Sequence, residues 1–200
     1  INTGLGALHK GNIQLVSFGP HFSPLSNSER YGLYRSCSDS FQTFKDLKLE
    51  KKEDSCRFKG WSRLIAPLSK EQTNQRFSKV SPGSQWVHFD IRAKKDQTFL
   101  DVYLSKYEDK NPVSFVFFIS AQKAQLPGEK TFLPQSLMQF KGKSCQILFE
   151  SEGEKLTIEP SQSMAMQLIP LAGIKHFWGA NFLLAFSLEK ENKNFSWTIT

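Results

Sequence analysis

The sequence predicts an all-β protein, an antiparallel β-sandwich of roughly nine to eleven short strands with at most one short helix. Three observations support this fold class. Several segments alternate apolar and polar residues with a period of two, as strands with one buried face do. Turn-forming residues recur about every 8–12 positions, a spacing typical of sandwiches and barrels. Phenylalanine, which favours strands, occurs 18 times among the 200 residues.

The clearest strand is WVHFDIRA at residues 86–93. Its aliphatic and aromatic face alternates with a second face that carries Trp86, His88, Asp90 and Arg92. The segments 12–20 and 55–65 alternate in the same way. The residues KKDQ are typical of a turn, so we expect residues 86–93 and 98–105 to form a hairpin.

The second half of the chain continues this pattern. VSFVFFIS at residues 113–120 is apolar on both faces, which predicts a central strand that is covered on both sides. The turn EGE indicates a second hairpin. The remaining strands are predicted at residues 144–151, 155–160, 163–170 and 181–189 and in the closing NFSWTIT. No apolar run approaches the about 20 residues that are needed to cross a bilayer.

Two segments depart from the strand pattern. Residues 39–52 are the best helix candidate, because Phe41, Phe44 and Leu47 follow helical spacing. Residues 66–85 are polar, contain two prolines and show no period, which predicts a long loop.

The length predicts one sandwich domain over residues 1–200, since such a chain can bury roughly 70% of its unfolded surface without a disulfide or a metal. Because the chain starts with Ile1 rather than Met, we expect a processed product or a piece of a longer protein. No signal peptide is recognised. Three cysteines favour reduced thiols, and a Cys37–Cys56 disulfide is the alternative in an exported protein.

The charge is concentrated in one half of the chain. Residues 1–100 hold 16 basic residues (Lys and Arg) against 9 acidic residues (Asp and Glu), whereas residues 101–200 hold 10 basic and 10 acidic residues. A basic half suggests an acidic partner, such as an anionic polysaccharide, nucleic acid or an acidic surface, and the alternative is a solvated surface. Acidic residues interrupt the lysines, so the charge pattern gives only weak support for a nucleic-acid-binding groove.

Motifs of common cofactor and metal sites are missing from the sequence. It contains no phosphate-binding glycine loop, no dinucleotide fingerprint, and no HExxH, GxSxG or EF-hand pattern. Neither a CxxC pair nor histidines at metal-ligand spacing occur. We therefore predict no cofactor and no metal.

The first 35 residues hold one candidate ligand site. Its main members are His9, His21, Arg30 and Tyr31, accompanied by Lys10, Asn27, Glu29 and Arg35. Planar donors beside an aromatic ring suit a hydroxylated or anionic ligand, as in sugar sites. The alternative is a polar surface loop with a buried tyrosine. If the domain contributes chemistry, His9 or His21 is the candidate general base, because an imidazole titrates near pH 6.5.

Two further candidates lie on or beside predicted strands. In KHFWGAN, His176 and Trp178 could form a ligand shelf; alternatively, the aromatic residues plug the end of the sandwich and Asn181 caps the turn. The outward face of residues 86–92 could meet a ligand or a partner domain. Its alternative is a solvent face with a His–Asp–Arg network between strands, in which something covers Trp86.

Two stretches carry a resemblance. GLGALHKGNIQLVSFGPH at residues 4–21 resembles an opening strand in the β-domain of a sugar enzyme, and MAMQLIPLAGIKHFWGANFLLAFSL at residues 164–188 resembles the closing strands. The class is the β-sandwich domain of heparinase-like polysaccharide lyases and related galactose-mutarotase-like sandwiches. The resemblance covers most of the chain as a pattern, and no catalytic residue of the lyases matches position by position.

The resemblance implies a carbohydrate context, in which this domain binds an oligosaccharide or polysaccharide or supports one wall of a cleft. The helical toroid that precedes such sandwiches and the histidine-rich metal motif of the lyases have no counterpart here, so catalysis by this chain alone is in doubt. The rival is a non-catalytic interaction or structural module with a basic face. A nucleic-acid binder is a third reading, supported only by RFKGWSR at residues 57–63.

Overall fold

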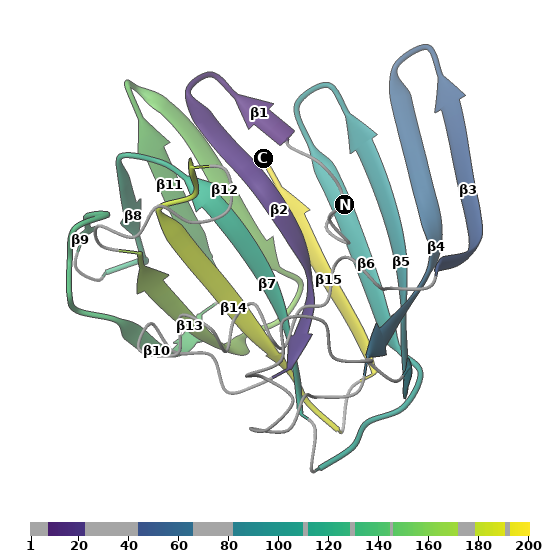
Figure 1. Cartoon of the computed structure of the whole chain (residues 1–200). Coiled ribbons are helices and arrows are strands. Elements are labelled where there is room, and N and C mark those ends of the chain that lie inside the picture. Colours follow the sequence, from purple (N-terminus) through teal and green to yellow (C-terminus); the bar gives the residue numbers. More distant parts are fainter. Residues whose placement is uncertain are drawn as a thin grey trace.

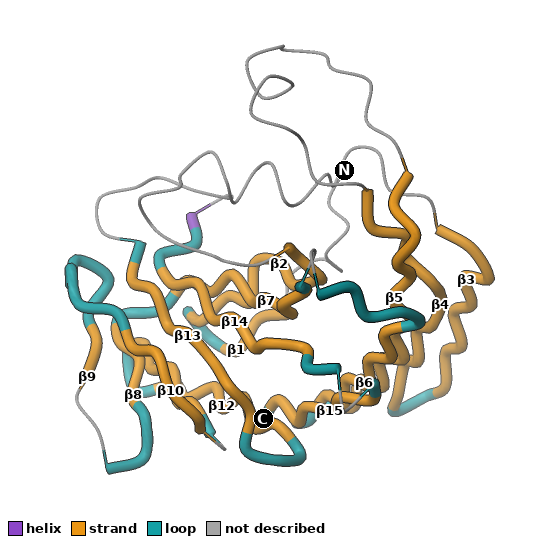
Figure 2. Tube along the Cα trace, turned by 90° about the horizontal axis from the view of Figure 1, so that it is seen from below, coloured by secondary structure: helices purple, strands orange, loops and turns teal. Residues whose placement is uncertain are grey.

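The computed structural model describes residues 8–22, 44–65, 82–109, 112–128, 131–144, 146–171, 179–190 and 193–200. It confirms the predicted fold class. Two antiparallel sheets pack face to face as a sandwich, and Figure 2 shows them as two layers. Every strand pair in both sheets is antiparallel, which agrees with the alternating patterns of the sequence.

The smaller sheet has six strands in the order β1-β2-β7-β14-β13-β10. Its strands are β1 (Leu8–Lys10), β2 (Ile13–Phe22), β7 (Val113–Ser120), β10 (Phe140–Ser144), β13 (Met164–Pro170) and β14 (Phe182–Leu188). The central strand β7 is buried on both faces from Val113 to Ile119, as its continuous apolar sequence predicts.

The larger sheet has nine strands in the order β3-β4-β5-β6-β15-β12-β11-β8-β9, and Figure 1 shows β3 to β6 side by side at one edge. Its first members are β3 (Phe44–Lys52), β4 (Ser55–Ile65), β5 (Pro82–Lys94) and β6 (Thr98–Leu104). The others are β8 (Lys123–Gln125), β9 (Thr131–Phe132), β11 (Ile147–Ser151), β12 (Glu154–Pro160) and β15 (Asn194–Ile199).

The core lies between the sheets and is centred on aromatic rings. Trp197 of β15 is almost fully buried, and its ring centroid lies 5.1 Å from that of Phe115 and 5.6 Å from that of Phe186, both in the opposite sheet. Ring pairs at such distances add about 0.5–1.5 kcal/mol beyond the area they bury. The high phenylalanine content therefore serves to join the two sheets.

The two predicted hairpins are confirmed. In the first, β5 pairs with β6 from Val87↔Leu104 to Ala93↔Thr98, and Lys94 N–H donates to the Gln97 carbonyl at 2.8 Å. In the second, β11 and β12 are joined by two residues with positive φ, Glu152 at 51° and Gly153 at 86°. Two successive positive φ values define the tight hairpin turn whose twist matches the strands.

The number of strands is higher than predicted. The described residues form fifteen strands instead of nine to eleven, and three of the additional ones, β1, β8 and β9, contain only two or three residues. Segments this short show no periodicity that a sequence pattern could reveal. They are defined by their hydrogen bonds to longer neighbours.

The helix predicted at residues 39–52 is wrong over the described part of that segment. Residues 44–52 form strand β3, which pairs with β4, and Leu47 and Leu49 are about half exposed. Pairing with a long neighbouring strand overrides the weak helical spacing. In the part of the chain that the structure describes, no helix is long and apolar enough to cross a membrane.

Candidate functional site on the larger sheet

A row of polar and aromatic side chains crosses the outer face of β3 to β6. Lys45 pairs with Trp61, Trp61 with His88, and His88 with Tyr103. The period of two creates this row, because Val87, Phe89 and Ile91 of β5 are buried in the core and the alternate residues point away from it. The predicted outward face of residues 86–92 is thus confirmed as the start of a larger surface.

The aromatic rings of this row contact one another edge to face. The Trp61 ring centroid lies 5.0 Å from that of His88, with an angle of 62° between the ring planes. It lies 6.0 Å from that of Tyr103, with an angle of 85°. These are favourable geometries for aromatic pairs. The rings therefore hold one another in fixed orientations on a partly exposed surface.

Two cations lie over the tryptophans. Lys45 Nζ is 4.4 Å from the Trp86 ring centroid and 5.3 Å from that of Trp61. Arg63 Cζ is 5.4 Å from the Trp86 centroid. These distances allow cation–π attraction, and they identify what covers Trp86. We call this set, Lys45, Trp61, Arg63, Trp86, His88 and Tyr103, the aromatic–cation face.

Next to this face, two aspartates lie opposite each other. Asp90 on β5 pairs with Asp101 on β6, an arrangement that is repulsive unless the charges are neutralised. Arg57 donates to both carboxylate oxygens of Asp90, with 2.8 Å from Nε to Oδ1. Arg92 pairs with Asp101, which also accepts a 2.6 Å hydrogen bond from Ser196. The interstrand network thus consists of two aspartate–arginine pairs, and among the described residues it differs from the predicted His–Asp–Arg network in that His88 forms no ion pair with either aspartate.

The pKa values of this region follow from the same contacts. The hydrogen bonds from Arg57 lower the pKa of Asp90 and outweigh the opposing effect of burial. The pKa of Arg57 is raised in turn. Burial lowers the pKa of His88. The positive charges of Lys59 and Arg57 also lower it, whereas the negative charge of Asp90 raises it. At neutral pH the site thus presents an ionised Asp90 and an uncharged His88 imidazole.

This arrangement suits recognition better than acid–base chemistry. A general acid needs a raised carboxyl pKa, and that of Asp90 is lowered. The oxygens of Asp90 are already engaged by Arg57. Among the described residues, no cluster of three or more His, Cys, Asp or Glu side chains could hold a metal ion. Aromatic rings with adjacent cations, in contrast, can bind a ligand that has both an apolar face and negative charge.

Of the ligand-contact residues predicted from the sequence, His9 and His21 belong to the described part of the chain, and neither is a member of the aromatic–cation face. His9 on β1 pairs with Gln14 of the neighbouring strand β2. His21 lies on β2 itself and pairs with Ser114 of β7. Seven strand positions, roughly 23 Å, separate Gln14 from His21, so the backbone does not bring the two histidines together. Arg30, Tyr31, His176 and Trp178 lie outside the described residues. Their role in ligand contacts, and that of His9 or His21 as a general base, stays a prediction.

Asn181, the last residue of the predicted KHFWGAN shelf, has a structural role. Its side-chain oxygen accepts from Ala121 N–H at 3.0 Å, and its Nδ2 donates to the Ala121 carbonyl at 2.8 Å. Its backbone N–H donates to the carbonyl of Ile119. The side-chain oxygen and the side-chain nitrogen of Asn181 are thus both hydrogen-bonded within the fold. This is in line with the alternative that Asn181 caps the turn.

The sequence reasoning missed Lys45 and Arg63 as partners of the tryptophans. Alternation in residues 55–65 already placed Trp61 and Arg63 on one face, and this signal could have been combined with Trp86 on the next strand. Lys45 could not be found, because its segment was predicted to be helical. Strand register, which the sequence does not encode locally, is what brings the three strands together.

Comparisons with known proteins give little further guidance. No protein-family model matches the chain, and no curated protein matches it. Among solved structures, the chain is similar to the crystal structure of a 4-alpha-glucanotransferase from Thermococcus litoralis, with 13% sequence identity and a TM-score of 0.49. The match covers 92% of this chain and 27% of that one. This likeness does not confirm the heparinase-like resemblance, and we base no functional inference on it.

Proposed function

We propose that this domain binds carbohydrate, specifically an acidic oligosaccharide or polysaccharide, through the aromatic–cation face. The observation that carries the proposal is the placement of Trp61 and Trp86 on adjacent strands, partly exposed and within reach of Lys45 and Arg63. A sugar ring has an apolar C–H face that packs on an aromatic ring, and its carboxylate or sulfate groups pair with cations.

Lys45 is suited to a role in ligand exchange. Its backbone lies on the edge strand β3, its side chain is exposed, and its ammonium group interacts with both tryptophan rings. An incoming sugar can displace this flexible side chain from the rings, and an anionic substituent then pairs with the ammonium group. The cation that covers the site in the free protein would thereby contribute to binding.

The test is a titration of the protein with three tetrasaccharides: one carboxylated, one sulfated and one neutral, with single-stranded DNA of similar length for comparison. We expect saturable binding of at least one acidic oligosaccharide and weaker binding of the neutral one. Trp61→Ala should reduce the affinity at least about tenfold, because aromatic anchors commonly contribute more than 1 kcal/mol. The matched control is Leu137→Ala, which removes a side chain that is 85% exposed and lies between β9 and β10.

Two results would overturn the proposal. One is the absence of binding to every tetrasaccharide at millimolar concentration by a folded protein. The other is an equal loss of affinity in Trp61→Ala and Leu137→Ala. DNA that binds as tightly as the acidic sugars, and that is released by salt, would indicate recognition of charge alone.

The rival function, a protein-interaction module, also has an observation in its favour. The edge strand β3 exposes Leu47 and Leu49 among lysines, and an exposed edge can pair with a strand of another protein. However, lysines and the irregular pairing between Lys45 and Lys48 are features that discourage such pairing. A Leu49→Lys variant distinguishes the two functions, since it should leave sugar binding unchanged and abolish pairing at this edge.

A further inference from the structure

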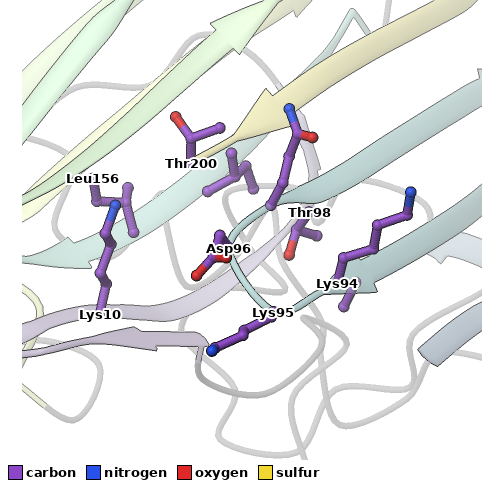
Figure 3. Close-up of a pocket in the computed structure, with 10 residues that line it drawn as sticks. Lys10, Lys94, Lys95, Asp96, Thr98, Leu156 and Thr200 are labelled. Atoms are coloured by element: carbon purple, nitrogen blue, oxygen red, sulfur yellow. The ribbon is translucent and has the colours of Figure 1, made fainter. Parts of the chain in front are cut away.

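A second charged region lies at the opposite end of β5, away from the aromatic–cation face. A pocket of about 180 Å³ is formed there by the end of β1, the β5–β6 turn and the ends of β12 and β15. It is smaller than the roughly 300 Å³ at which pockets for drug-sized ligands begin. Figure 3 shows the residues that line it, and Leu156, Thr98 and Ile199 are buried beneath it.

The rim of this pocket is cationic. Lys10, Lys94 and Lys95 line it together with one acid, Asp96. In the view of Figure 3, the ammonium group of Lys10 lies to the left of Asp96, that of Lys95 lies below it and that of Lys94 lies to its right. The pocket therefore concentrates positive charge from two chain segments that are more than 80 residues apart in the sequence.

These lysines are not neutralised within the fold. Ion pairs in the described part of the chain involve Arg57, Lys59, Arg92, Lys106, Lys123 and Lys190, and none involves the lysines of the pocket. Asp96 likewise has no ion pair among the described residues. Cations that line one pocket and form no ion pair among the described residues leave their attraction available for an external anion.

We propose that this pocket binds an oxyanion, namely a sulfate, phosphate or carboxylate group, with Lys10 and Lys95 as its main contacts. The size of the pocket suits such a group alone or as the substituent of a single sugar unit. The inference does not depend on the proposed function, because it concerns different residues and a different end of the sheet.

The test uses NMR titrations with sodium sulfate, sodium phosphate, sodium glucuronate and neutral glucose at constant ionic strength. We expect saturable shifts at the amides of residues 94–98 with the anions and none with glucose. Lys95→Gln and Lys10→Gln should each weaken binding about threefold to tenfold, the usual effect of losing one charge-assisted contact. Lys94→Gln should have a smaller effect, and Asp96→Asn should strengthen binding by removing a repulsive charge.

Lys141→Gln is the matched control, since it removes one positive charge from an exposed residue of β10 at the far edge of the other sheet. The affinity of this variant for the anions should equal that of the unmodified protein. The proposal is wrong if no anion causes saturable shifts at residues 94–98, or if Lys141→Gln weakens binding as much as Lys95→Gln. Equal affinities for sulfate and glucuronate would identify a free ion as the ligand, and tighter binding of glucuronate would identify an acidic sugar. Loss of sugar binding in Trp61→Ala leaves this result unaffected.

Discussion

The hairpin of β5 and β6 carries two charged regions of different character. Near Trp86 and along the middle of the strands, each charge has a partner: Asp90 pairs with Arg57, Asp101 with Arg92, and Lys45 lies over two tryptophan rings. At the turn, Lys94, Lys95 and Asp96 form no ion pair among the described residues. The first region uses its charges to order the sheet surface, whereas the second leaves them available to a ligand.

This difference has a structural cause. In the middle of a sheet, register fixes which side chains lie opposite each other, so Asp90 and Asp101 need cationic neighbours on adjacent strands. At the β5–β6 turn, Lys94 lies opposite the uncharged Ser55 of β4, and Lys95 and Asp96 lie beyond the last residue pairs of β5. Charge placed at a turn therefore contributes little to stability and can be used for binding.

The largest effect on stability should come from breaking a paired charge. We expect Asp90→Ala to lower the free energy of unfolding by on the order of 1 kcal/mol, because it leaves Arg57 without its hydrogen-bonded partner beside Arg92 and Lys59. Asp96→Ala, on the same hairpin, should change it by less than about 0.5 kcal/mol. Urea unfolding of the two variants measures both values, and equal losses would contradict the contrast between the regions.

A second prediction concerns pH. Because burial lowers the pKa of His88 below its ordinary value of 6.5, the unfolded chain binds a proton more readily than the folded one. Stability should therefore fall as the pH falls from about 7 through the folded pKa of His88, and then level off. The lowered pKa of Asp90 adds a separate loss at more acidic pH, below its ordinary 3.8.

His88→Gln should flatten the first of these two slopes and leave the second in place. Thermal midpoints measured between about pH 2.5 and 8 cover both slopes and provide the comparison. Lys95→Gln leaves His88 and its surroundings in place, so it should retain the full slope. A slope that is unchanged in His88→Gln would assign the dependence to another group.

Ser196→Ala should have a smaller effect than Asp90→Ala. The hydroxyl of Ser196 donates to Asp101 at 2.6 Å, but Arg92 remains to neutralise that carboxylate. We expect a loss of roughly 0.5 kcal/mol, at the low end for a hydrogen bond. Urea unfolding of Ser196→Ala, of Arg92→Gln and of the double variant tests this. A loss in the double variant equal to the sum of the two single losses would show that the two contacts to Asp101 are independent.

Much of the fold could be predicted from the sequence because period-two alternation reports directly on burial. The pattern of residues 86–93 and the continuous apolar run of residues 113–120 both match the observed burial. Turn residues identified the two hairpins. The strand at residues 44–52 could not be found in this way, since the side chains of residues 45–52 are exposed and its extended form depends on pairing with β4.

For the candidate site, the sequence determined which residue types lie on the outer face, namely the tryptophan, histidine and charged positions of β4 and β5. Only the tertiary structure decided which of them meet. The register of two strand pairs brings Lys45, Trp61 and His88 into one row, and the joining of two sheets brings Lys10 to the β5–β6 turn. The physical reason is that alternation is a local property of the chain, whereas register and sheet packing depend on contacts between segments far apart in the sequence.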